Sequence, residues 1–202
     1  RQLWIAAVIS MMGEWFNTIA LFFLILEYTD SEFLLGVLFT VRMAGFALLQ
    51  PFIGLMADRY NRKSLMIVSN LAQMVLALCF LMVNDANDIV WMIGLSGLMM
   101  VLHGVYMTAE RAALPNLVTK EDLATANALD AASWSTALCI GAMLGGVVVS
   151  LWGTDAAFII DSFTFLIGTL FLITLKIPQK IDPSMKGPWF STAISNMKRG
   201  WR

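Results

Sequence analysis

Two ionisable residues stand inside long apolar stretches of the sequence. Glu14 lies within residues 3–26 and Arg42 within residues 33–54. An ionisable side chain inside a membrane helix costs about 2.5–3.5 kcal/mol on insertion scales, so such a residue is a functional candidate. At 1.5 Å per residue, Glu14 lies about 16 Å and Arg42 about 19 Å from the same end of their helices. We therefore expect the two side chains to meet near the midplane of the membrane.

The opposite charges of this pair favour a role in binding or in proton transfer. Ser10, Glu14 and Asn17 share one helix face, which directs Glu14 toward a polar cavity. Burial favours the neutral form of a carboxyl group and a nearby cation favours the ionised form, so rearrangement of the pair can load or release a proton. The alternatives are a proton switch, a substrate anchor and a static structural ion pair.

Two other candidates among the ionisable residues of the apolar stretches are His103 and Asp161, and Asp130 is a weaker one. His103 lies within residues 89–109, and histidine is the side chain that changes charge most readily near neutral pH. A lone histidine in a membrane helix more often makes a hydrogen bond between helices. Asp161 lies within residues 155–176, where it is expected either to line a cavity or to pair with a neighbouring helix.

The elements that must position these residues are apolar segments of membrane length. The chain is 59% hydrophobic and only 13% charged, whereas about a quarter of the residues in a soluble domain are charged. About 20 apolar residues cross a hydrocarbon core of about 30 Å. Six segments meet this length: residues 3–26, 33–54, 64–83, 89–109, 126–150 and 155–176. The sequence therefore predicts an all-α membrane protein with a six-helix bundle over residues 1–176.

The connections between these segments alternate in charge. Residues 27–32, 84–88 and 153–155 contain acidic side chains and no lysine or arginine. The other connections and both ends contain the cations, including Arg1, Arg59, Arg62, Lys63, Arg111, Lys120, Lys176 and Arg202. The positive-inside rule places these basic segments in the cytoplasm. We expect a multi-pass protein of the cell membrane with both ends of this segment cytoplasmic.

Residues 177–202 differ from the rest in composition. Helix-breaking residues come first: Pro178, Pro183, Gly187 and Pro188. Large apolar residues then recur on one helical side: Trp189, Phe190, Ile194, Met197 and Trp201. This pattern predicts a cytoplasmic linker with an amphipathic helix on the inner membrane surface. A flexible cytosolic tail is the alternative.

Residues 54–63 carry the most specific motif of the chain. They follow the pattern Gly-x-x-x-Asp-Arg-x-x-Arg-Lys between the second and third apolar segments. This pattern resembles the motif that the major facilitator superfamily carries in the loop between its second and third helices. The resemblance implies the N-terminal half of a twelve-helix transporter, whose two halves alternate between outward-facing and inward-facing states.

The resemblance also implies a conformational gate in this loop. Asp58 and the motif cations would latch the two halves in the outward-facing state. The cations are Arg59, Arg62 and Lys63. Gly54 is expected to let the end of the second helix approach a neighbour closely. The alternative is a cytoplasmic anchor without a switching role.

Other segments extend the resemblance over nearly the whole chain. Residues 10–16, 111–118 and 123–128 are similar to the drug and siderophore exporters of the superfamily, in its macrolide-efflux and enterobactin-exporter-like branch. Residues 141–146 resemble the glycine motif of the fifth helix, with Ala142 in place of the usual proline. Met99 and Met100 stand where the family often has an arginine.

Small residues recur every four positions in the fifth segment. They are Ala137, Gly141 and Gly145. Such a ridge lets two membrane helices pack closely. We therefore assign Gly141, Gly145 and the adjacent Gly146 to helix packing.

The leading function is secondary active efflux of a small amphipathic compound, such as a drug or a siderophore. Protons are the expected coupling ion. A metabolite facilitator or uniporter is the alternative within transport, and a six-span channel or membrane enzyme is the alternative outside it. The sequence has no Gly-x-Ser-x-Gly-like nucleophile motif. One histidine and two scattered cysteines argue against a metal enzyme.

The expected partners follow from this function. They are a small-molecule substrate, the lipid bilayer, protons and a C-terminal six-helix half that these residues do not include. No cofactor, metal or nucleic acid is expected. The chain begins at Arg1 and not at a methionine, as a segment of a longer transporter would; a half-size protein is the alternative.

Overall fold

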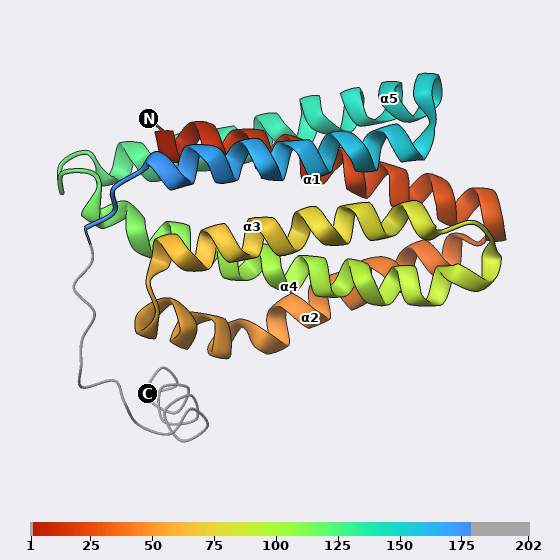
Figure 1. Ribbon diagram of the computed structural model, residues 1–202, viewed down its shortest axis with the longest axis horizontal. Coiled ribbons are helices and arrows are strands. Elements are labelled where there is room, and N and C mark those ends of the chain that lie inside the picture. Colours follow the sequence, from red (N-terminus) through yellow and green to blue (C-terminus); the bar gives the residue numbers. More distant parts are fainter. Residues whose placement is uncertain (1, 179–202) are drawn as a thin grey trace.

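The computed structural model describes residues 2–178 of the chain, and these form a bundle of long helices without a strand (Figure 1). The α-helices are α1 (Gln2–Thr29), α2 (Glu32–Arg59), α3 (Arg62–Cys79), α4 (Ile89–Ala113) and α5 (Leu123–Thr174). Three short 3-10 helices accompany them: η1 (Phe80–Met82), η2 (Ala86–Asp88) and η3 (Leu114–Asn116). Five helical segments among the described residues are long and apolar enough to cross a membrane.

The helix α5 consists of two antiparallel arms. Its 52 residues are more than twice the length that one crossing requires. Gly153 has φ 82° and ψ 173°, a backbone conformation that glycine adopts easily because it lacks a Cβ atom. The chain reverses there (Figure 1). The first arm, residues 123–152, and the second arm, residues 154–174, closely follow the predicted segments 126–150 and 155–176.

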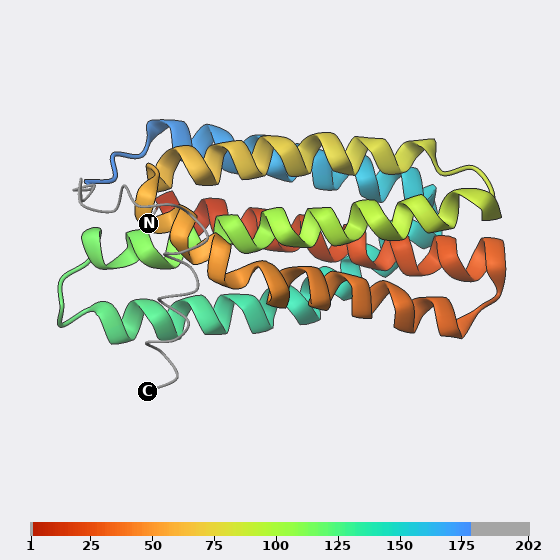
Figure 2. The same ribbon diagram turned by 90° about the horizontal axis from the view of Figure 1, so that it is seen from below.

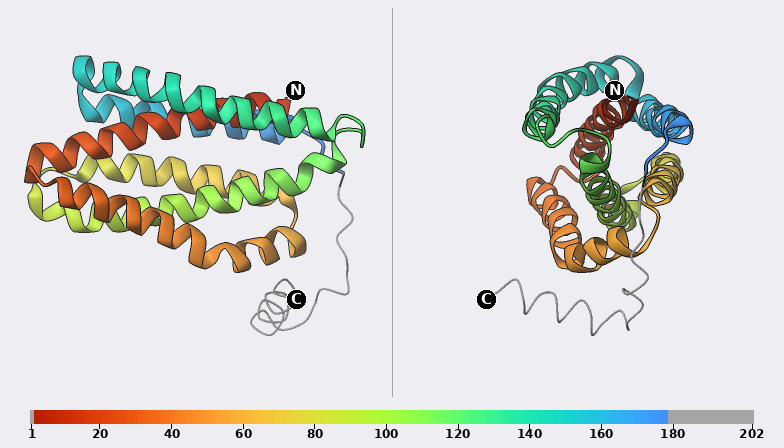
Figure 3. Two further views of the ribbon diagram at one scale, coloured as in Figure 1. Left: turned by 180° about the vertical axis from the view of Figure 1, so that it is seen from behind. Right: turned by 90° about the vertical axis from the view of Figure 1, so that its left-hand side faces the viewer.

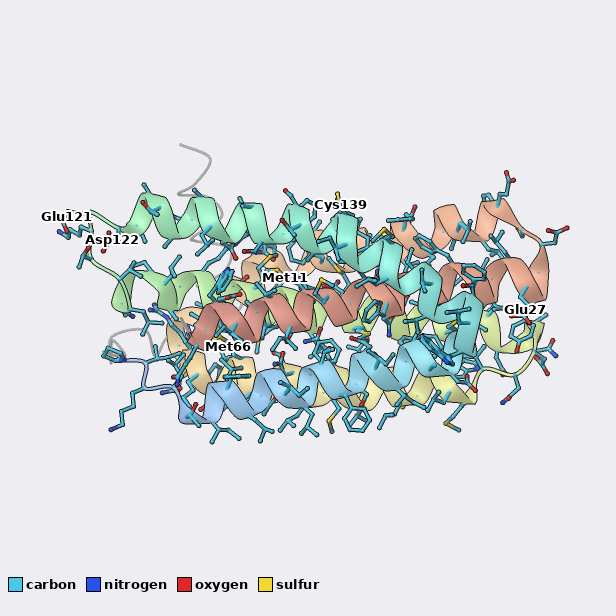
Figure 4. The ribbon with its side chains drawn as sticks, turned by 90° about the horizontal axis from the view of Figure 1, so that it is seen from above. Met11, Glu27, Met66, Glu121, Asp122 and Cys139 are labelled. Carbon is cyan, nitrogen blue, oxygen red and sulfur yellow. The ribbon has the colours of Figure 1, made fainter. Side chains whose placement is uncertain are left out.

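The connections between helices alternate between the two ends of the bundle (Figures 1 and 2). We call one end the acidic end; it contains residues 30–31, 83–88 and 153. The other is the basic end, with residues 60–61, 117–122 and 175–178. Figure 4 shows Glu27 near the acidic end and Glu121 with Asp122 at the basic end. The alternation agrees with the charge pattern of the sequence.

The connection between α2 and α3 is shorter than expected. Because α2 continues to Arg59 and α3 begins at Arg62, the motif at residues 54–63 contains only two non-helical residues. Asn61 caps α3 by accepting a hydrogen bond from the backbone N–H of Ser64 at 3.0 Å. Such a cap satisfies an N–H group that the helix leaves free. Most of the motif is therefore held rigidly at two helix ends.

The helices pack so that polar residues lie between two apolar clusters. α1 packs mainly against both arms of α5, α2 against α4, and α3 against α4 and α5 (Figure 3). The larger cluster includes Leu21, Leu38 and Phe158. The smaller cluster, which includes Leu3 and Leu172, lies closer to the basic end. The surface helix predicted for the tail lies outside the described residues.

Candidate functional site

Glu14, Arg42 and His103 meet from three different helices. Arg42 Nη2 of α2 donates to Glu14 Oε1 of α1 at 3.4 Å. His103 Nδ1 of α4 lies 3.0 Å from Glu14 Oε2. Each oxygen of one carboxylate thus faces a different basic group. We call these three residues the charged cluster.

The charged cluster is largely buried and only loosely bonded. Arg42 is 6% exposed, and its Nη1 atom has no hydrogen-bond partner among the described residues. Its contact with Glu14 at 3.4 Å is longer than the roughly 2.7–2.9 Å of a strong charge-assisted hydrogen bond. A buried cation with one long contact is incompletely compensated for its lost hydration. Small side-chain movements can therefore change which groups of the cluster are paired.

The charged cluster lines a cavity of about 330 Å³, which we call the cluster cavity. Its walls are mostly sulfur-containing and aromatic side chains: Met11, Trp15, Phe39, Met43, Phe46, Met100, Met107 and Trp134. Met100 stands near the position of the arginine that is frequent in α4 of similar transporters. In this chain α2 supplies a buried guanidinium to the cavity through Arg42.

Asp161 lies apart from these three residues, in the contact between α1 and the second arm of α5. It is fully buried. A Cβ atom added at Gly13 would lie 2.7 Å from Asp161 Oδ1, so this glycine allows the close approach. Asn17 is a polar neighbour, but neither carboxylate oxygen has the geometry of a hydrogen bond with a described residue. Asp161 was expected either to line a cavity or to pair with a neighbouring helix. Its burial against Gly13 of α1 favours the second position.

Two cations of the loop motif bind the ends of other helices. Arg62 Nη1 donates to the backbone oxygen of Ala112 at 2.7 Å, and Lys63 Nζ donates to that of Ile173 at 2.7 Å. Both carbonyls lie in the last turn of a helix, where the helix dipole is negative. These bonds connect α3 to the basic ends of α4 and α5.

The other charged residues of the motif lie at the end of α2. Arg59 is half-buried, whereas Asp58 is exposed. Within residues 2–178, Asp58 forms no ion pair. The carboxylate is thus accessible at the basic end of the bundle, which is where the proposed gate requires it.

The glycines assigned to packing divide into two groups. A Cβ atom at Gly141 would lie 2.9 Å from Trp15 Cβ, and one at Gly145 would lie 3.2 Å from Phe16 Cα, so both glycines lie against α1. A Cβ atom at Gly54 or Gly146 would have no neighbour within 4 Å. The close approach expected at these two glycines is therefore not made by the described residues, because this part of the helix surface faces away from them.

A second cavity, of about 400 Å³, adjoins the cluster cavity, and we call it the side cavity. The two cavities share five lining residues: Met11, His103, Met107, Arg111 and Trp134. The side cavity also has carboxylates, Glu110 and Asp130, and amides, Asn70 and Gln73. This site was not predicted from the sequence. The sequence feature that could have indicated it is the pair Asn70 and Gln73, two polar residues three positions apart in the apolar segment 64–83.

Comparison with known proteins agrees with the fold. The profile of the family described as Major Facilitator Superfamily matches residues 3–201. Macrolide efflux protein A of Streptococcus pyogenes is 23% identical over 190 residues, which cover 90% of this chain and 47% of that protein. The uncharacterized MFS-type transporter YfiS of Bacillus subtilis strain 168 is 21% identical over 201 residues, which cover 95% and 46%.

The length of the match also agrees with the architecture. The chain spans about half the length of these curated relatives. The family match covers both arms of α5 and all helices before it. The chain belongs to the major facilitator superfamily of membrane transporters.

Proposed function

We propose that this six-span bundle is the N-terminal half of a secondary active transporter that exports a small amphipathic compound, such as a drug or a siderophore, in exchange for protons. The observation that supports the proposal is the buried charged cluster. It joins an acid to two bases from three helices, between the apolar clusters of the bundle. The similarity to macrolide efflux protein A of Streptococcus pyogenes supports the outward direction.

Glu14 is the proton-binding group of the proposed cycle. When Glu14 is ionised, its two oxygens face Arg42 and His103. When Glu14 accepts a proton, the charge that attracts Arg42 disappears. The cluster then favours a different arrangement of α1, α2 and α4. Proton binding thus shifts the balance between two conformations, as coupled transport requires.

The walls of the cluster cavity fit an amphipathic substrate. Methionine side chains adapt to ligands of different shape, and aromatic rings provide large apolar contact surfaces. The charged cluster provides the polar contacts of the same cavity. This combination is typical of a site that accepts compounds with both apolar and polar parts.

The loop motif is the proposed gate. Arg62 and Lys63 hold the basic ends of α4 and α5, and Asp58 is accessible beside them. In the outward-facing state, Asp58 would bind the positive end of a helix in the other half. The transport cycle would break and re-form this contact.

Transport by the full-length protein in proteoliposomes tests the proposal. With ethidium as the amphipathic probe, we expect a pH gradient to drive uptake and ethidium addition to cause proton movement. Glu14→Gln should reduce the gradient-driven rate by about 5–150-fold, the usual range of coupling between two sites. Glu121→Gln removes an exposed carboxylate at the basic end and should leave the rate unchanged.

Two results would contradict the proposal. If Glu14→Gln transports with unchanged rate and pH dependence, Glu14 is not the proton switch. If wild-type transport does not respond to the pH gradient, the protein is a facilitator or uniporter.

A further inference from the structure

We infer that the side cavity binds a hydroxylated organic cation, that is, an amine carrying several hydroxyl groups. The inference rests on the proposed export function and specifies its substrate class. Three independent features of the cavity lead to it: its carboxylates, its unpartnered polar side chains and its apolar wall.

The carboxylates lack cationic partners in the bundle. Glu110 of α4 is 8% exposed, and Asp130 of the first arm of α5 is half-buried. Neither forms a salt bridge within residues 2–178, and their charges repel each other. Arg111 also lines the cavity but is exposed, so water screens its charge. A bound ammonium group would relieve the repulsion and pair with both acids.

The polar side chains of the cavity also lack partners. Asn70 is 0% and Gln73 is 1% exposed, and Tyr106 is buried. Gln73 Nε2 donates to the backbone oxygen of Ser69 at 3.2 Å, but its Oε1 atom accepts no hydrogen bond from described residues. Both polar atoms of the Asn70 side chain and the Tyr106 hydroxyl are likewise unpartnered there. Ser10 adds another unpartnered hydroxyl.

Such groups are rare in folded proteins because burial without a hydrogen bond is costly. Amides and hydroxyls both donate and accept. They therefore match a ligand whose own groups also do both, which is the property of a hydroxyl. An amine without hydroxyl groups would satisfy the carboxylates and leave the amides unpaired.

The remaining wall suits the carbon skeleton of such a compound. It contains Met11, Met107, Trp134 and Phe165. Aromatic rings also attract cations through their π faces. The volume of about 400 Å³ lies within the range of about 300–1,000 Å³ that is usual for small-molecule sites.

The position of His103 connects this site to the charged cluster. His103 lines both cavities and lies 3.0 Å from Glu14. An occupant of the side cavity can thus influence the proton at Glu14 through one side chain. This arrangement would couple the binding of the cation to the proton switch.

Calorimetric titration of the full-length protein in lipid nanodiscs tests the inference, with empty nanodiscs as the blank. Three probes share a hexyl chain: N-hexyl-D-glucamine has a cation and hydroxyls, hexylamine only the cation, and hexyl β-D-glucoside only the hydroxyls. We expect N-hexyl-D-glucamine to bind more tightly than either of the others. Equal affinity for hexylamine would overturn the inference, since the amides would then contribute nothing.

Substitutions of the two cavity carboxylates test whether the probe binds in the side cavity. Glu110→Gln and Asp130→Asn should each weaken binding of N-hexyl-D-glucamine by about tenfold to hundredfold, as expected for one charge-assisted hydrogen bond. Glu121→Gln should bind like the wild type. Unchanged binding in both cavity variants would overturn the inference. If Glu110→Gln does not fold, the half-buried position of Asp130 makes Asp130→Asn the deciding variant.

The same titration separates this inference from the proposed function. Glu14→Gln should lose gradient-driven transport and still bind N-hexyl-D-glucamine, because Glu14 does not line the side cavity. Binding without gradient-driven transport in the wild type would overturn the proton-coupled function and support the site. Gradient-driven transport without binding of this probe would overturn the site alone.

Discussion

The two neighbouring cavities differ in how their polar groups are paired. In the cluster cavity, one carboxylate contacts two bases of the protein itself. In the side cavity, two carboxylates, two buried amides and two buried hydroxyls face a shared space, and the described residues provide almost no partners for them. The cavities are of similar size and share part of one wall.

This difference indicates different tasks. Groups that pair with each other can exchange partners when a proton arrives, which suits a switch. Groups that lack partners in the bundle gain most from a ligand, because a ligand can provide the hydrogen bonds that the bundle does not. The same kinds of side chain can therefore serve proton coupling in one cavity and recognition in the other. Three substitutions test this contrast through the stability of the protein.

The largest effect is expected from breaking the charged cluster. Arg42→Met removes the cation and leaves Glu14 largely buried with His103 as its remaining basic partner. We expect the free energy of unfolding to fall by about 3 kcal/mol, the lower end of the range for a broken buried ion pair. Unfolding by SDS titration in mixed micelles provides the measurement.

The double variant Glu14→Gln/Arg42→Met is the matched control. It removes both charges, so it should recover most of the lost stability. If the single and double variants are equally stable, the contact at 3.4 Å contributes nothing and the contrast between the cavities fails.

A smaller effect is expected from pushing α1, the helix that carries Glu14, away from α5 without removing a charge. Gly13→Ala would place a Cβ atom 2.7 Å from Asp161 Oδ1 and 2.9 Å from Thr164 Cβ, which pushes α1 away from the second arm of α5. Such overpacking typically costs about 1–3 kcal/mol. Gly146→Ala adds the same methyl group in open space and should leave stability nearly unchanged. A loss of equal size in both variants would contradict the assigned contact.

The smallest effect on the free energy of unfolding should be an increase and not a decrease. Asn70→Leu removes a buried amide that has no partner among the described residues, so we expect the ligand-free protein to be unchanged or about 1 kcal/mol more stable. Asn61→Leu removes an amide that caps α3 and should cost about 1 kcal/mol. Thermal unfolding compares the two. A destabilised Asn70→Leu variant would show that this amide already has a partner, such as ordered water.

The fold and the charged cluster could be predicted because each depends on a few properties that the sequence shows directly. Apolar runs define the helices to within a few residues, and charges define the two ends. The meeting of Glu14 and Arg42 follows from their depth and from the helix faces that they occupy. Both quantities can be read from a sequence of regular helices.

The remaining features depend on how the helices rotate and pack. The side cavity combines residues of α1, α3, α4 and both arms of α5, and no local pattern gives that arrangement. The burial of Asp161 depends on a glycine about 150 positions earlier in the chain. The axial position of Asp161 can be read from the sequence, but the side of the helix that meets α1 cannot. The bonds from Arg62 and Lys63 to helix ends likewise depend on tertiary contacts.

The reversal at Gly153 has a consequence for how the protein enters its membrane. A single non-helical residue joins the two arms of α5, so no polar loop separates them during insertion. The arms must enter the bilayer together, as one helical hairpin. Asp161 would be costly to insert on an isolated helix, but here it enters beside an apolar companion that shares the insertion free energy. The tight turn thus links the insertion of the second arm to that of the first.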